Sequence, residues 1–475
     1  MNEPRAHQKE LEGDQRKQEQ DSKACRLVKR ARVKPSQVRK TALQILAQAE
    51  SDLADVGDLL NAAQAEGMCD ARDRGLLMEL VYGVLRQRGL LDAHIDAVCR
   101  VRSLPPALRH LLRLGLYQLL FLDRIPPFAA VSTAVDLAKE IGGAGAGRLV
   151  NALLRNVLRN TSALPLPDPI REPIRHIAVA HSHPEWLVAR WMRRWGTEKT
   201  IALCQHNNTP PPVTLRVNAL KTDRATLAAQ WTLEGITVQP TPHAPDGLYV
   251  SGVSVAALSA FNSGAFYAQD EGAQLISYLV DPQPGETILD FCAAPGGKTT
   301  HLAERMGGRG RVVATDVSQE RCVRLRENVV RLGTPGVSVV SPEAALAGYY
   351  DRILIDAPCS ALGVLRRVPE GKWNKTEGLI ADFAQTQIRI LLQVAPRLRP
   401  GGRLVYATCS TEEEENARVV AALSAACPDM TLECPTESLP ASARQFVNAR
   451  GFFTTAFNAS KMDVFFAARW VKIAP

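Results

Sequence analysis

The sequence predicts a multidomain protein: an all-α bundle, then a small α+β connecting module, then an α/β domain with a mostly parallel sheet. Three observations support this fold class. The chain has 475 residues, which is enough for two to four domains. Apolar residues recur at helical spacing in the first third of the chain, with few strand signals. From Thr287 onward, short apolar strands alternate with helices, a pattern typical of parallel strands joined by crossover helices.

The composition is that of a globular protein outside membranes. Hydrophobic residues make up 46% of the chain and charged residues 22%, so most of the chain can form a core. The longest apolar stretch, Leu111 to Leu122, is interrupted by Arg113 and Gln118, so no segment is suited to cross a bilayer. The first residues lack the apolar segment of a secretory signal. We therefore expect a cytoplasmic protein.

The positive charge is concentrated at the N-terminus. The formal net charge is +8, and residues 1–40 hold 12 Lys and Arg against 6 Asp and Glu. We expect residues 1–35 to form a basic, disordered tail, which could attract RNA phosphate or simply be solvated. The remainder is nearly neutral, so net charge is a weak indication of a nucleic-acid partner.

The ten cysteines do not form a recognisable metal motif. They include no C-x-x-C pair and no His/Cys cluster at zinc-finger spacing, so we expect no structural metal. In a reducing compartment most of them should be reduced and buried as small apolar residues. A functional role for any cysteine therefore needs a special context.

Residues 36–165 are predicted to form the all-α bundle. Apolar residues repeat at helical spacing in three stretches, Leu76–Val84, Leu108–Leu119 and Leu149–Leu158. The third stretch also places three arginines on another face, Arg148, Arg155 and Arg159. Such arginines suit contact with phosphate, although arginines on a bundle surface are usually only solvated.

A Pro-punctuated linker, Thr161 to Pro169, is predicted to end the bundle. Residues 166–270 should form the connecting α+β module, with helices near Trp186–Trp195 and Arg224–Leu233. The tryptophans at helical intervals are expected to pack in a core or hinge. Residues 271–475 then form the α/β domain.

The first motif of the α/β domain lies where a buried strand turns into a helix. Residues Leu289 to Thr300 read LDFCAAPGGKTT, and the two glycines let a ligand approach bare backbone at a helix N-terminus. The ending imitates a P-loop, but Cys292 occupies the position of that motif's first glycine, which disfavours a nucleotide triphosphatase. Asp316 ends the next strand, where an acid can bind ribose hydroxyls. The pattern fits a nucleoside-bearing cofactor; a purely structural turn is the second interpretation.

Two cysteines end two further strands. Asp356 and Cys359 follow the strand DRILID, and Cys409 ends the strand RLVYAT. Ligands of open α/β sheets bind at the carboxyl ends of strands, so we expect these residues to face the same crevice as the glycine turn. A lone cysteine there is usually structural. Here two cysteines lie at two such strand ends, together with an aspartate and a turn that suits a cofactor. This combination favours a catalytic role over a structural one.

This set of residues suits methylation of a pyrimidine at C5. That carbon becomes nucleophilic only after a thiolate adds at C6, so a cysteine is the natural catalyst. A carboxyl group such as that of Asp356 can bond the base edge and support the protonated ring. A second cysteine can then assist release of the product.

The three ordered motifs resemble those of the RNA 5-methylcytosine methyltransferases of the Nol1/Nop2/Sun type. The resemblance implies a Rossmann-like catalytic domain, with Cys409 as nucleophile and Cys359 serving product release. It also implies S-adenosyl-L-methionine as the methyl donor. The implied cofactor residues are Cys292, Ala293, Ala294, Pro295, Gly296, Gly297, Lys298, Asp316 and Asp356.

The helical region resembles the NusB-like RNA-binding domain of the ribosomal RNA small subunit methyltransferase B subfamily, through Asp73–Arg86 and Leu149–Arg155. With His183–Leu187 and Leu215–Asn218 in family order, the resemblance runs from about residue 36 to the C-terminus. It implies 16S rRNA or an early small-subunit assembly particle as partner. The target cytosine should be unpaired or flipped out, and we expect a monomer.

The sequence departs from the family at two places. A Gly-Asp pair that contacts adenosine is replaced by Val339–Glu343, where Ser341 or Glu343 could substitute. The C-terminal Gly-Asp-Gly-Phe-Phe signature is reduced to Met462–Phe466, which we expect to be a late strand.

Two alternative functions stay open. One is the same chemistry on transfer RNA. The other is a non-enzymatic RNA-binding assembly factor that retains a cofactor fold. The cysteine pair argues against the second, because a degenerate domain has no reason to keep both thiols.

Overall fold

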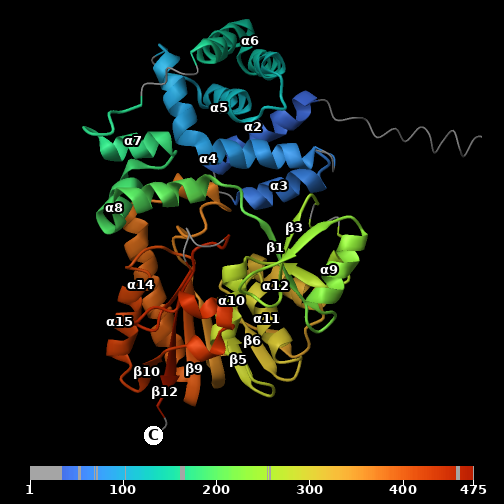
Figure 1. Ribbon diagram of the computed structural model, residues 1–475, viewed down its shortest axis with the longest axis vertical. Coiled ribbons are helices and arrows are strands. Elements are labelled where there is room, and N and C mark those ends of the chain that lie inside the picture. Colours follow the sequence, from blue (N-terminus) through green and yellow to red (C-terminus); the bar gives the residue numbers. More distant parts are fainter. Residues whose placement is uncertain are drawn as a thin grey trace, which may run out of the picture. The chain divides into compact units, whose positions relative to one another are not determined.

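The computed structural model describes residues 35–51, 55–68, 70, 73–101, 103–160, 166–253, 255, 258–455 and 461–473. The predicted tail, apart from Pro35, and residues 161–165 of the predicted linker lie outside the described residues. The chain divides into two compact units, which are described separately (Figure 1). Among the described residues, the first unit comprises those from 35 to 84 and from 94 to 160, and the second comprises those from 85 to 93 and from 166 to 473.

The first unit is built from helices, as predicted. Its helices are α2 (Pro35–Ser51), α3 (Val56–Ala65), most of α4 (Arg74–Val98), α5 (Pro106–Phe121) and α6 (Pro127–Arg159). Helices α5 and α6 pack so closely that a Cβ on Gly115 would lie 2.9 Å from Leu154 Cδ1. Leu158 is exposed rather than part of the apolar stripe. The predicted basic face, Arg148, Arg155 and Arg159, is exposed.

The second unit begins with the connecting module. Its elements are α7 (Pro173–Ala180), α8 (Glu185–Asn208), β1 (Val213–Val217), α9 (Arg224–Leu233), β2 (Thr237–Pro240), β3 (Gly247–Ser251), a short 3-10 helix η2 (Ser259–Phe261) and β4 (Phe266–Ala268). The four strands form an antiparallel sheet in the order β2-β3-β1-β4. Buried Trp231 of α9 packs edge-on against Phe266 of β4, with ring centroids 5.3 Å apart. This module is the predicted α+β unit.

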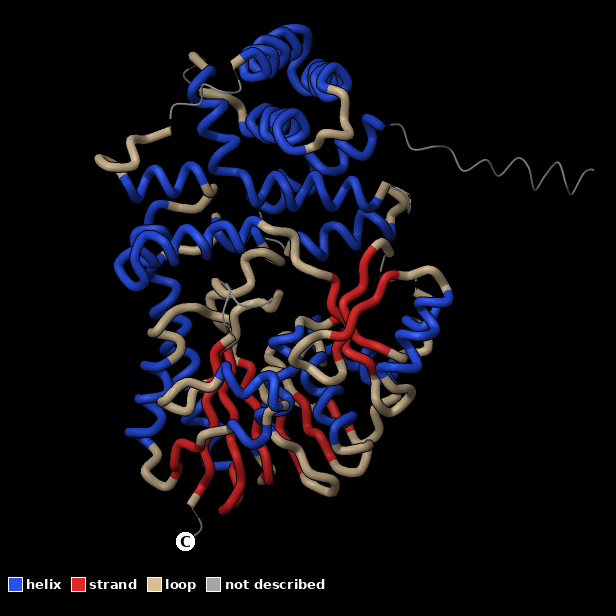
Figure 2. Tube along the Cα trace, in the orientation of Figure 1, coloured by secondary structure: helices blue, strands red, loops and turns tan. Residues whose placement is uncertain are grey.

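The α/β domain alternates strands and helices (Figure 2). Its first part comprises α10 (Glu271–Val280), β5 (Thr287–Asp290), α11 (Gly297–Arg305), β6 (Arg311–Ala314), α12 (Gln319–Leu332), β7 (Val337–Val339), α13 (Pro342–Leu346) and β8 (Tyr350–Asp356). Its second part comprises η3 (Pro369–Lys372), α14 (Glu377–Val394), η4 (Ala395–Arg397), β9 (Leu398–Thr408), α15 (Ala417–Ala426), β10 (Met430–Glu433), η5 (Thr436–Ser438), η6 (Ala441–Phe446), β11 (Phe453–Thr454) and β12 (Phe466–Lys472).

The main sheet has the order β10-β12-β9-β8-β5-β6-β7, with β11 pairing to β12. Strands β5 to β9 are parallel, and β10, β11 and β12 pair antiparallel at one side. The order reverses between β5 and β8, and ligands of open α/β sheets bind beside such a reversal, at the carboxyl ends of the strands. The predicted Rossmann-like, mostly parallel sheet is confirmed.

Local sequence signals account for the element boundaries. The Ser318 hydroxyl accepts a hydrogen bond from the Arg321 N–H and caps α12. Gly333 ends the same helix at φ 63°, a conformation that glycine adopts at little cost. Between these ends, Cys322, Leu325 and Leu332 are buried.

Met462–Phe466 was predicted to be a strand, but only its last residue is in one, because β12 begins at Phe466. The preceding residues are held by other contacts. The Val464 N–H donates to Gly363 O at 3.0 Å, and the buried carboxyl group of Asp463 pairs with Arg367. No helix in the described part of the chain is long and apolar enough to span a membrane.

Candidate active site

The two predicted cysteines meet at the carboxyl edge of the sheet. Cys359 lies in the loop after β8 and Cys409 directly follows β9, and their Sγ atoms are 3.4 Å apart. The Gly363 N–H donates to Cys409 O at 2.8 Å and ties the loop to the strand end. A Cβ on Gly363 would lie 2.8 Å from that carbonyl oxygen and 2.4 Å from Val464 O, so glycine permits this close approach.

A buried carboxyl group that the sequence analysis did not single out joins the two cysteine segments. Glu415 accepts hydrogen bonds from the Ser360 N–H at 2.7 Å and the Ser360 hydroxyl at 2.5 Å. It also accepts from the Ser410 hydroxyl and from Gln387 Nε2 at 3.2 Å. Ser360 and Ser410 are the residues that directly follow the two cysteines. Glu415 thus fixes one cysteine segment against the other.

Asp356 and Lys298 form an ion pair beside the thiols. Lys298 Nζ lies 2.6 Å from Asp356 Oδ2 and 5.4 Å from the ring centroid of Phe465. Burial lowers the pKa of the Lys298 ammonium, but attraction to Asp356, Cys409 and Asp290 outweighs burial, and the net change is upward. Lys298 therefore stays cationic next to Cys409.

The surroundings of Cys409 favour its neutral thiol in this state. Its pKa is raised well above the ordinary value by the hydrogen bond with Cys359, by burial and by the charge of Asp356. Lys298 acts in the opposite direction and lowers the pKa. The reactivity of Cys409 is therefore under the control of its two neighbours, Cys359 and Lys298.

The glycine turn, which contains Gly296 and Gly297, adjoins the ion pair of Lys298 and Asp356. Gly296 has φ 103°, and a Cβ on Gly297 would lie only 2.8 Å from Tyr267 Cε1. The turn borders a pocket of about 160 Å³. The pocket is lined by Tyr267, Gln269, Ala273, Asp290, Cys292, Ala293, Ala294, Pro295, Gly297, Lys298 and Asp356.

Two predicted residues, Gly296 and Asp316, support the pocket from outside its lining. The Asp316 carboxylate accepts from the Ala294 N–H at 3.2 Å and from the Ser318 N–H at 3.0 Å, which joins the glycine turn to α12. Neither Ser341 nor Glu343 lines the pocket. Ser341 instead caps α13 by accepting from the Ala344 N–H at 3.3 Å.

Asp290, at the end of β5, is a second residue that the sequence analysis did not single out. Thr299 Oγ1 donates to its Oδ2 at 2.7 Å, while Oδ1 is buried without a hydrogen-bond partner among the described residues. Burial raises the pKa of Asp290 to about 7, and the Thr299 hydrogen bond opposes that rise. The pocket thus contains a buried oxygen that a ligand can satisfy.

Family comparisons match three consecutive parts of the chain. Residues 36–159 match the NusB family, and residues 183–256 match the ferredoxin-like domain of RsmF/B-like methyltransferases. Residues 277–471 match the 16S rRNA methyltransferase RsmB/F family. The chain is also 37% identical over 423 residues to the probable ribosomal RNA small subunit methyltransferase B of Bacillus subtilis, covering 87% of this chain and 94% of the relative. The chain belongs to the 16S rRNA methyltransferase B/F family.

Further relatives agree with this membership of the 16S rRNA methyltransferase B/F family. Ribosomal RNA small subunit methyltransferase B of Sodalis glossinidius is 37% identical over 406 residues, covering 83% of this chain and 91% of the relative. The crystal structure of PH0851 is 26% identical and has a TM-score of 0.76, covering 92% of this chain and 99% of that chain. The protein is thus an RNA methyltransferase, as the motifs predicted.

Proposed function

We propose that this methyltransferase acts on C5 of a cytosine in 16S rRNA through a covalent adduct between Cys409 and C6 of the base. The observation that carries the proposal is the 3.4 Å approach of Cys359 and Cys409 beside the Asp356–Lys298 ion pair. Methylation at an oxygen or at an exocyclic nitrogen needs no thiol, because those atoms are themselves nucleophiles. Two thiols at one strand edge suit a ring carbon that must first be activated.

The pocket at the glycine turn supports S-adenosyl-L-methionine as the cofactor. Gly297 lets the Tyr267 ring, which also lines the pocket, pack directly against the turn, and Asp290 presents an unsatisfied buried oxygen. The segment from Cys292 to Pro295, Gly297 and Lys298, with Asp290 and Asp356, would hold the bound molecule, while Gly296 and Asp316 fix the turn from outside the lining. When bound, the cofactor supplies the electrophilic methyl group.

Cys409 begins the reaction as the nucleophile. The Cys409 thiol passes its proton by way of Asp356 to the polar edge of the ring as its sulfur adds to C6, so an S–C6 bond forms and the electron pair of the C5–C6 double bond becomes available at C5. Lys298 stabilises the thiolate, because it lowers the pKa of Cys409. We assign to Asp356 the support of the protonated ring at its polar edge.

Cys359 completes the reaction after C5 has received the methyl group. The C5 proton leaves to solvent by way of the Cys359 sulfur, the C5–C6 double bond re-forms, and the S–C6 bond breaks to return the Cys409 sulfur, which takes back its proton from the ring. The 3.4 Å separation from Cys409 Sγ keeps Cys359 close to the adduct. The reaction yields 5-methylcytosine and releases one proton.

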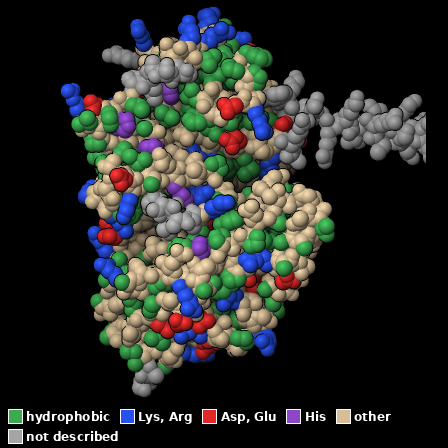
Figure 3. Space-filling view, in the orientation of Figure 1, with side chains coloured by type: hydrophobic (Ala, Val, Ile, Leu, Met, Phe, Trp, Pro, Cys, Tyr) green, Lys and Arg blue, Asp and Glu red, His purple; other side chains and the backbone are tan. Residues whose placement is uncertain are grey.

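Features of the helical unit favour 16S rRNA, or an early small-subunit particle, as the binding partner. It matches the NusB family and exposes Arg148, Arg155 and Arg159 along one helix, which suits phosphate contact. On the face shown in Figure 3, Lys and Arg side chains lie among Asp and Glu rather than in one continuous patch. We propose that a monomer acts in the cytoplasm and recognises a local RNA shape.

Methylation in vitro tests this proposal. The full-length protein is incubated with S-adenosyl-L-methionine and, separately, with 16S rRNA transcript, early small-subunit particles and tRNA. We expect nucleoside mass spectrometry to detect 5-methylcytidine in 16S rRNA, and bisulfite sequencing to map it to one position. Any other methylated nucleoside would overturn the C5 chemistry, and exclusive labelling of tRNA would overturn the substrate.

A further inference from the structure

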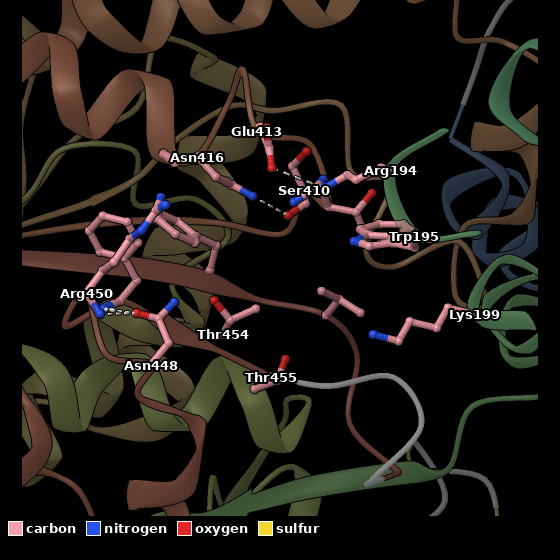
Figure 4. A pocket seen from close by; sticks show the side chains of 15 residues that line it. Arg194, Trp195, Lys199, Ser410, Glu413, Asn416, Asn448, Arg450, Thr454 and Thr455 are labelled. Atoms are coloured by element: carbon pink, nitrogen blue, oxygen red, sulfur yellow. Dashed lines mark hydrogen bonds and ion pairs between the residues drawn. The ribbon is translucent and has the colours of Figure 1, made fainter. Parts of the chain in front are cut away.

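A second and larger cavity is lined in part by Ser410 (Figure 4), the residue that follows Cys409. Its volume is about 520 Å³, within the range of about 300–1,000 Å³ that is usual for ligand pockets. Its walls come from α8, from the segment after β9, and from the region of β11 and β12. It is lined by Arg194, Trp195, Lys199, Ser410, Thr411, Glu413, Asn416, Ala417, Asn448, Arg450, Phe452, Thr454, Thr455, Val464 and Phe466.

This cavity is separate from the pocket at the glycine turn, because the two share no lining residue. It is nevertheless adjacent to the nucleophile. Ser410, which lines it, directly follows Cys409, so their Cα atoms lie about 3.8 Å apart. A polymer whose target base reaches Cys409 therefore has a neighbouring unit within reach of this cavity.

The cavity carries excess positive charge. It is lined by the cations Arg194, Lys199 and Arg450, against the single acid Glu413. Arg194 Nε lies 3.4 Å from Glu413 Oε1, so this acid is already paired. Neither Lys199 nor Arg450 makes an ion pair within the described residues. Two cations thus remain to bind a negatively charged group.

The acidic run after Cys409 does not cancel this charge. Of the four glutamates from Glu412 to Glu415, only Glu413 lines the cavity. Glu412 and Glu414 pair with Arg190, which is outside the lining. The carboxyl group of Glu415 is buried against Ser360 and Ser410.

Aromatic side chains provide apolar walls in the same cavity. Trp195 is partly buried, and the Arg194 guanidinium lies 4.5 Å from its ring centroid. On another wall, Phe452 and Phe466 pack edge-on with centroids 5.4 Å apart. Cations combined with aromatic surface are typical of sites for single-stranded nucleic acid, where bases stack and phosphates pair.

We propose that this cavity binds a nucleotide adjacent to the target cytosine, with Lys199 and Arg450, on opposite sides of the cavity (Figure 4), each pairing with a backbone phosphate, and with the base against the aromatic wall. The inference rests on the proposed function, because it takes the RNA to be threaded past Cys409. It deepens that function by assigning a binding subsite for a flanking nucleotide.

The test compares Lys199→Ala/Arg450→Ala with the wild-type enzyme on 16S rRNA transcript. We expect KM to rise about tenfold with kcat unchanged, because phosphate contacts are lost while the thiols remain. The dependence of log affinity on log salt should become shallower by about 0.7 for each cation removed. Arg309→Ala is the control, because Arg309 is an exposed cation just before the amino end of β6, and it should leave both quantities unchanged.

A second measurement addresses the base. An RNA fragment that contains the mapped target is made with an abasic residue immediately 5′ or 3′ of it. One of the two abasic RNAs should bind wild-type enzyme about tenfold more weakly than intact RNA does. In the double variant Lys199→Ala/Arg450→Ala, the difference in affinity between that abasic RNA and intact RNA should be smaller. Unchanged KM and salt dependence in the variant, or equal binding of all RNAs, would overturn the subsite. A product other than 5-methylcytidine would instead overturn the proposed function.

Discussion

The Sγ atoms of Cys359 and Cys409 lie 3.4 Å apart, and each cysteine is followed by a serine that bonds to Glu415. The cysteines are 50 residues apart in the chain and reach one point because β8 and β9 are parallel neighbours. The hydrogen bond from Cys359 is the largest contribution that raises the pKa of Cys409, so Cys359 controls how readily Cys409 becomes a nucleophile.

The first prediction concerns thiol reactivity. Cys359→Ala removes the hydrogen bond that most raises the pKa of Cys409, so alkylation of Cys409 should have its midpoint at lower pH. Lys298→Met removes a cation that stabilises the thiolate, so the midpoint should move to higher pH. Iodoacetamide labelling across pH, read by peptide mass spectrometry, measures both. Shifts in the same direction would contradict the described electrostatics.

The second prediction concerns Glu415. Glu415→Ala removes the acceptor of four buried hydrogen bonds, and should lower the free energy of unfolding by about 2–4 kcal/mol. It should also lower kcat more than it raises KM, because the two thiols lose their fixed separation. Glu437→Ala is the control, since the Glu437 side chain is 88% exposed. Normal kcat in a folded Glu415→Ala enzyme would argue against this role.

The third prediction concerns pH. Asp290 has a pKa of about 7 in the folded protein, against an ordinary value of 3.8. Between these values the folded state retains a proton that the unfolded state has lost, so this group's contribution to stability falls as pH rises, by about 4 kcal/mol. The free energy of unfolding of Asp290→Asn, relative to that of the wild type, should therefore increase from pH 4 to pH 8. Urea denaturation at both pH values measures it, and a difference independent of pH would refute the assignment.

The fourth prediction concerns the glycine turn. Gly296→Ala should weaken S-adenosyl-L-methionine binding at least tenfold, because an L-residue at φ 103° is strained and its Cβ would lie 2.6 Å from Leu325 Cδ1. Gly401→Ala is the matched control, since φ is 74° there and no atom lies within 4 Å of the added Cβ. It should cost stability without loss of affinity in calorimetric titration. Equal affinity of both variants would contradict the cofactor site.

Sequence patterns predicted much of the fold because local signals agree with tertiary structure. The helix α9 has the predicted bounds, Arg224–Leu233, and α12 begins at a serine cap and ends at a glycine, which are local signals. The parallel sheet followed from alternating strands and helices. The Met462–Phe466 stretch was predicted to be a strand because it is apolar. Its apolar residues are indeed packed, but the Val464 N–H donates to the carbonyl oxygen of Gly363 in a loop rather than to a neighbouring strand.

The candidate site was less completely predictable. Motifs at strand ends indicated Cys359, Cys409 and Asp356, because the carboxyl ends of parallel strands share one edge. Glu415 could not be singled out, because four consecutive glutamates look alike in sequence and only the fold decides which is buried. Lys199 and Arg450 are 251 positions apart in the chain, and only tertiary structure brings both to one cavity.

Trapping of the protein–RNA adduct tests the covalent route through Cys409. Cys359→Ala, Cys409→Ala and the double variant are incubated with 16S rRNA transcript and S-adenosyl-L-methionine, then separated on denaturing gels. Cys359→Ala should accumulate an adduct that resists denaturation, while the other two variants should form none and Cys409→Ala should transfer no methyl group. An adduct in Cys409→Ala, or normal methyl transfer by it, would contradict the account.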